Sequence, residues 1–109
     1  MKLLVTVVQD QDAPLLLDAL MQREYGVTKL ASTGGFLRVG NTTLLVGIED
    51  DQVDAVIAII NEICRSRTKT ITPLPPFNGS VEAYISSPLE VNVGGATIFV
   101  LDVEQFIKL

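Results

Sequence analysis

The sequence has 109 residues, 48% of them hydrophobic, and a chain of this size folds as one domain, so we expect a single domain over residues 1–109. Its formal net charge of −5 is unfavourable for a partner that is a nucleic-acid polymer, because such binding rests on many Lys and Arg contacts to phosphate. Its apolar runs are too short to cross a bilayer, so we expect no membrane partner.

The N-terminal third predicts a strand, a helix and a second strand. Residues 2–8 are rich in Val and Leu and predict a buried strand. Asp12 is expected to cap a helix whose first turn holds Pro14, because proline is tolerated at that position. The inward stripe of this helix is predicted at Leu16, Leu17, Leu20 and Met21.

Gly26 is expected to end that helix in the left-handed conformation, and residues 27–33 then predict the second strand. The glycines at 34, 35 and 40 indicate a loop around residues 36–39, and residues 42–48 predict a third strand. Asp50 and Asp51 are placed to cap a second helix. Its apolar positions recur at helical spacing: Val53, Val56, Ile57, Ile60, Ile63 and Cys64.

The last third predicts a long loop followed by a hairpin. Residues 68–88 hold Pro73, Pro75, Pro76 and Pro88 and are expected to form a long flexible loop. Residues 89–93 and 96–101 predict two strands paired through Gly94-Gly95, because paired glycines suit a tight turn. Residues 103–109 are expected to form a short helix or strand.

The order strand, helix, strand, strand, helix, strand is that of the ferredoxin-like βαββαβ fold, an α+β class with two helices on one face of an antiparallel sheet. The other face of such a sheet is bare. Several strands are apolar on both sides, so self-association is favoured over a monomer. The residues that are candidates for either face are Val5, Val7, Leu44, Val46, Ile98 and Val100.

The densest cluster of glycines and hydroxyls lies at residues 33–43 and has two interpretations. Backbone amides of the glycines can approach an anion, Arg38 or Lys29 can offset phosphate charge, and Phe36 can stack on a base. An ordinary turn fits the same residues, and no GxxxxGK[ST] or GxGxxG motif is present. From the residues alone, the turn is favoured.

The sequence does not favour catalysis or a metal site. No histidine is present to act as a general base, and the lone Cys64 falls on an apolar helix stripe. The acidic residues at 10–12 and 49–51 precede predicted helices and are interpreted as caps, so no metal ligand is expected. A single cysteine also needs no oxidising compartment, so we expect a cytoplasmic protein.

Four segments together resemble the PII-like cyclic di-AMP receptor family: residues 8–12 (VQDQD), 28–38 (TKLASTGGFLR), 40–43 (GNTT) and 93–100 (VGGATIFV). The resemblance covers essentially the whole chain. It implies a bacterial, non-enzymatic homotrimer that binds the second messenger cyclic di-AMP between subunits and regulates an unidentified protein through loop ordering. By matching position, it implies ligand contacts at Thr28, Gly35, Phe36, Leu37, Asn41, Gly47 and Phe99.

Two positions depart from that family, whose binders commonly carry Asn where this chain has Glu24 and Arg where it has Gly26. Both changes remove hydrogen-bond donors. The alternative is therefore a PII-like sensor of another adenine nucleotide, or one that has lost ligand binding. An enzyme acting on a small phosphorylated substrate and a purely structural trimer are further alternatives.

Overall fold

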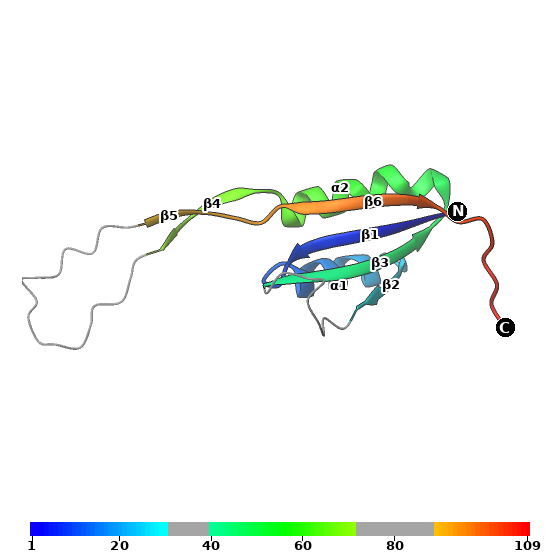
Figure 1. Cartoon of the computed structure of the whole chain (residues 1–109). Helices are drawn as coiled ribbons and strands as arrows, with labels where there is room; N and C mark the ends of the chain where they lie inside the picture. The colour runs from blue at the N-terminus through cyan, green and yellow to red at the C-terminus, as the bar shows by residue number, and fades with distance from the viewer. Residues whose placement is uncertain (31–39, 72–88) are drawn as a thin grey trace, which may run out of the picture.

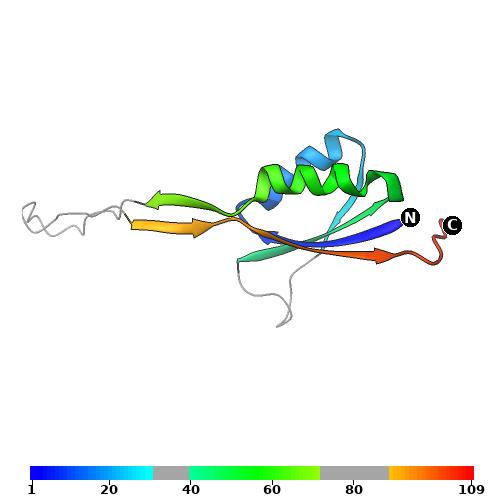
Figure 2. The same cartoon turned by 90° about the horizontal axis from the view of Figure 1, so that it is seen from above.

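The chain forms a four-stranded sheet with two helices on one face and a two-stranded ribbon that extends away from it (Figures 1 and 2). This computed structural model describes residues 1–30, 40–71 and 89–109. In chain order its elements are β1 (Lys2–Gln9), α1 (Ala13–Gln22), β2 (Gly26–Lys29), β3 (Asn41–Ile48), the 3-10 helix η1 (Asp50–Gln52), α2 (Val53–Cys64), β4 (Arg67–Ile71), β5 (Leu89–Val93) and β6 (Ala96–Asp102).

The predicted ferredoxin-like order is confirmed by β1, α1, β2, β3, α2 and β6. The main sheet has the order β2-β3-β1-β6, and each neighbouring pair is antiparallel. The ribbon of β4 and β5 is inserted between α2 and β6. None of the helices in the described residues is long and apolar enough to cross a membrane.

The predicted hairpin across Gly94-Gly95 is wrong. β5 pairs with β4, whereas β6 pairs with β1, so the two glycines join two different sheets. Their φ angles of +85° and +90° turn the chain from the ribbon into the main sheet (Figure 1). The pairing is decided by long-range partners that a local turn signal does not contain.

Two further boundaries need correction. The segment expected to be loop from residue 68 begins inside β4, which takes the chain to Ile71; the remainder of that expected loop, residues 72–88, lies outside the described residues. The predicted helix or strand over residues 103–109 is also wrong, because the chain there has neither. Val103 still donates its N–H to the carbonyl oxygen of Met1, so the start of this segment is tied to the sheet.

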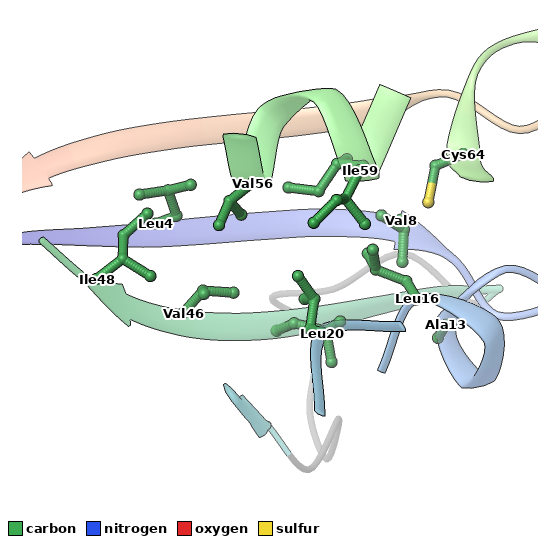
Figure 3. Packing of buried hydrophobic residues seen from close by; sticks show 12 residues of the cluster. Leu4, Val8, Ala13, Leu16, Leu20, Val46, Ile48, Val56, Ile59 and Cys64 are labelled. Carbon is green, nitrogen blue, oxygen red and sulfur yellow. The ribbon is translucent and has the colours of Figure 1, made fainter. Parts of the chain in front are cut away.

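The hydrophobic core lies between the helices and one face of the sheet, as Figure 3 shows. In α1, Leu16 and Leu20 are buried as predicted, but Met21 is exposed. In α2, the buried stripe includes Ile59, which lies outside the predicted apolar positions. The buried apolar residues are Leu4, Val8, Ala13, Leu16, Leu20, Leu44, Val46, Ile48, Val56, Ile59, Ile60 and Cys64.

The strand register assigns the residues that had been candidates for either face. Leu4 is in the core and pairs with Val100, so alternate positions of β1 and β6 face the helices. By this alternation Leu44, Val46, Ile98 and Val100 lie on the helix side, whereas Val5 and Val7 lie on the opposite side. We call that opposite side of the sheet the open face.

The end of α1 is formed by Glu24 and not by Gly26 as predicted. Glu24 has a φ of +62°, and its N–H donates to the carbonyl oxygen of Met21. The N–H of the next residue, Tyr25, donates to the carbonyl oxygen of Leu20. These two bonds form a Schellman motif with glutamate in the left-handed position. Gly26 is instead the first residue of β2.

We expect Glu24→Asn to raise the free energy of unfolding by about 0.5–1 kcal/mol, because asparagine adopts a positive φ more readily and removes a negative charge from the helix C-terminus. Urea denaturation at one fixed protein concentration measures the change. Arg23→Asn is the matched control, because Arg23 has a φ of −92° and gains nothing from asparagine. Equal effects of the two variants would contradict this explanation.

Candidate functional site

The four described candidate residues share the open face of the sheet. Asn41 and Gly47 alternate with the buried positions of β3, and Thr28 pairs with Leu45 on the same side. Phe99 pairs with Val5, which also lies on the open face. The other three candidates, Gly35, Phe36 and Leu37, lie outside the described residues.

One row of paired residues crosses all four strands and places two candidates at opposite edges. Thr28 on β2 pairs with Leu45, Leu45 with Val5, and Val5 with Phe99 on β6. Three inter-strand spacings separate the ends of this row by about 14 Å. Thr28 and Phe99 of one chain therefore cannot contact the same chemical group.

Two glycines lie side by side on the open face next to this row. Gly26 pairs with Gly47, and a Cβ added at Gly47 would meet no atom within 4 Å. At Gly26 the nearest atom to an added Cβ is the carbonyl oxygen of Gly47, at 3.8 Å. Because neither residue has a side chain, the sheet surface there is unobstructed and leaves room for a flat ring.

Asn41 lies at the other end of β3, beside a hollow of about 380 Å³. Gln9, Thr97 and the Gly94-Gly95 backbone also line this hollow. The amide of Asn41 can donate and accept hydrogen bonds at once, which suits the edge of a nucleobase. The hollow therefore places a polar recognition group beside the base of the ribbon.

The loop between β1 and α1 connects the start of β3 with the base of the ribbon. The N–H of Asp10 donates to the carbonyl oxygen of Gly40 at 2.8 Å, and the hydroxyl of Thr42 donates to the Asp10 carboxylate. On the ribbon side, the N–H of Gly94 donates to Oε1 of Gln9 at 2.7 Å. The end of β1 and the short loop that follows it thus contact both segments that flank the candidate site.

An ion pair at the base of the ribbon joins Asp12 and Arg67. Nη2 of Arg67 lies 2.8 Å from Oδ1 of Asp12, and Nη1 lies 3.4 Å from Oδ2. Asp12 is 1% exposed, and it makes no side-chain cap of α1, contrary to the prediction. Hydrogen bonding to Asp12 raises the pKa of Arg67 above its ordinary value. Sequence spacing held no signal for this pair, because 55 residues separate the partners.

The thiol of Cys64 is free and buried at the end of α2. Burial raises the pKa of the Cys64 thiol to about 11, so the thiol is protonated at neutral pH and is a poor nucleophile. No group of three or more Cys, Asp or Glu side chains in the described residues could hold a metal ion. A larger hollow of about 540 Å³ between α2 and β6 is lined by none of the candidate residues.

A protein family and a solved structure each match the chain over nearly its whole length. A family model described as "Cyclic-di-AMP receptor" matches residues 1–109. A crystal structure of a protein from Pediococcus pentosaceus ATCC 25745, described as functionally unknown, is similar with 40% sequence identity and a TM-score of 0.78. The similarity covers 99% of this chain and 96% of that chain, so fold and sequence agree from end to end.

Proposed function

The chain belongs to the cyclic-di-AMP receptor family, and we propose that it is a non-enzymatic signalling receptor that binds cyclic di-AMP at the subunit interfaces of a cytoplasmic homotrimer. The observation that supports the site is that Thr28, Asn41, Gly47 and Phe99 share the open face. Gly47 gives room for an adenine ring, Asn41 and Thr28 supply hydrogen bonds, and Phe99 supplies an apolar wall.

Two features of the open face support a site between subunits. Phe99 is 54% exposed on the edge strand β6, and Thr28 lies on the opposite edge strand β2. In a ring of three chains, Phe99 of one subunit can approach Thr28 of the next, which one chain alone cannot achieve. The open face between these two edges is partly apolar, through Val5 and Val7 on β1, and Leu101 extends the apolar surface along β6. Such a surface favours burial against a neighbouring copy of the chain.

We propose that the ribbon carries the signal to a regulated protein. The ribbon is two-stranded and projects from the main body (Figure 2), and such a ribbon is marginally stable without further contacts. Its base is joined through the β1–α1 loop to the start of β3, where the candidate Asn41 lies. Ligand binding beside Asn41 can therefore alter the ribbon through direct contacts.

Isothermal titration of the purified protein with cyclic di-AMP tests the binding, with cyclic di-GMP and ATP as controls. Analytical ultracentrifugation of the same sample measures the oligomeric state. We expect selective, saturable binding of one cyclic di-AMP per subunit to a trimer. Tighter binding of ATP or another adenine nucleotide would favour the alternative of a sensor with a different ligand, which Glu24 and Gly26 motivate. Turnover of cyclic di-AMP would contradict a non-enzymatic role.

Phe99→Ala is expected to weaken cyclic di-AMP binding about tenfold to a hundredfold, because an aromatic ring against a base contributes roughly 1–3 kcal/mol. Val100→Ala is the matched control. Val100 is 45% exposed on the same strand but lies on the helix side, so its truncation should leave the affinity unchanged. An equal loss in both variants would place the ligand elsewhere.

Mixing two variants with weakened binding tests the location of the site between subunits. Thr28→Ala and Phe99→Ala are unfolded together, refolded as mixed oligomers and titrated with cyclic di-AMP. If each site takes Thr28 from one chain and Phe99 from another, some interfaces contain both intact residues and recover wild-type affinity. A site within one chain predicts no recovery.

A further inference from the structure

A buried hydroxyl without a partner lies in the middle of the candidate site, on Thr43. Thr43 is 4% exposed, and its Oγ1 has no hydrogen-bond partner within the described part of the chain. The neighbouring Thr42 contrasts with it, because its hydroxyl on the helix side donates to the Asp10 carboxylate. Buried hydroxyls in native proteins are normally paired, so the unpaired group at Thr43 calls for an explanation.

The strand register places Thr43 between the candidate ligand contacts. Along β3, side chains alternate between the two faces, so Thr43 lies on the open face with Asn41 on one side and Leu45 on the other. Leu45 pairs with Thr28, which makes Thr28 a diagonal neighbour of Thr43. A ligand that contacts both Asn41 and Thr28 therefore spans the position of Thr43.

A second buried hydroxyl without a partner lies on Thr6, inside the hydrophobic core. Thr6 is fully buried, and its Oγ1 also has no partner among the described residues. The side chain of Thr6 lies on the helix side of β1, with those of Leu4 and Val8, and points into the hydrophobic core. An unpaired hydroxyl by itself therefore indicates no ligand; the distinguishing feature of Thr43 is its place on the open face.

We infer that the hydroxyl of Thr43 hydrogen-bonds to the bound adenine nucleotide and positions it between Asn41 and Thr28. This inference rests on the proposed function and adds to it a ligand contact beyond the seven predicted candidates. Asn41 and Leu45, the neighbours of Thr43 on the open face, are partly exposed, so a nucleotide held on this face lies next to residue 43. The period of two in β3, with Asn41 and Gly47 as candidates, is the sequence signal that points to residue 43.

The test replaces each unpaired threonine by valine, which has nearly the same shape but no hydroxyl. Thr43→Val is expected to weaken cyclic di-AMP binding about tenfold in isothermal titration, the effect of losing one hydrogen bond to a charged or polar ligand. Its urea midpoint without ligand should equal or exceed that of the wild type, because a buried unpaired hydroxyl is removed. Thr43→Ser, which keeps the hydroxyl, should retain most of the affinity.

Thr6→Val is the matched control and should leave the affinity unchanged while behaving like Thr43→Val in urea. Unchanged affinity of Thr43→Val, with wild-type protein that binds cyclic di-AMP, would overturn the inference and leave the proposed receptor function intact. Equal losses in Thr6→Val and Thr43→Val would also overturn it, because they would indicate a general effect on the sheet. Wild-type protein that binds no adenine nucleotide would overturn the proposed function and the inference together.

Discussion

Gly94→Ala is expected to lower the free energy of unfolding by roughly 3–5 kcal/mol, which is enough to unfold many single domains. A Cβ at this position would lie 2.5 Å from the carbonyl oxygen of Arg65 and 2.6 Å from Nη1 of Arg67. The carbonyl belongs to the backbone at the end of α2 and cannot rotate away as a side chain can. The φ of +85° adds the ordinary cost of a left-handed residue.

Gly95→Ala separates the close approach from the backbone conformation. Gly95 has a φ of +90°, but a Cβ there would meet no atom within 4 Å. We therefore expect a loss of only about 1–2 kcal/mol, the cost of the positive φ alone. Urea denaturation of both variants at one protein concentration measures the difference. Similar losses would contradict the role assigned to the contact between Gly94 and Arg65.

Arg67→Met is expected to lower the free energy of unfolding by about 2–3 kcal/mol. The substitution leaves the carboxylate of Asp12, which is 1% exposed, without its guanidinium partner. Removing one partner of a fully buried pair costs about 3–5 kcal/mol, but the side chain of Arg67 is 39% exposed, so water can replace part of the lost contact. Thermal or urea denaturation checks the value.

Two companion variants identify the cause of that loss. Arg65→Met removes an exposed cation two residues away and should change stability by less than about 0.5 kcal/mol. Asp12→Asn removes the buried charge itself and should cost less than Arg67→Met, because the guanidinium that remains is partly in water. If Asp12→Asn cost more than Arg67→Met, the explanation by an uncompensated buried charge would be wrong.

The sequence by itself determined most of the main sheet and both helices. Residues 2–8 and 42–48 are runs rich in aliphatic and β-branched residues, and residues 53–64 carry apolar side chains at helical spacing. The elements β1 (Lys2–Gln9), β3 (Asn41–Ile48) and α2 (Val53–Cys64) follow these patterns closely. These elements bury one continuous apolar face, so local pattern and final structure agree. The resemblance of four short segments also led to the family that the whole-chain match confirms.

Only the tertiary structure decided where the chain pairs over long distances. The glycines at 94 and 95 do turn the chain with positive φ angles, but the strands on either side of them pair with β4 and β1 and not with each other. The side chain of Asp12 was predicted to cap a helix, but its carboxylate is hydrogen-bonded to Arg67, which is 55 residues away in the sequence. Such contacts depend on which surfaces the folded chain brings together, and no local spacing specifies them.

The candidate site shows the same division. Alternation along β3 puts Asn41 and Gly47 on one face once the strand is known, and this much was available from the sequence. The faces of Thr28 and Phe99, and the row that places them at opposite edges, required the register between four strands. Register is fixed by burial of one whole face against the helices, a property of the packed sheet that the separate strands do not have.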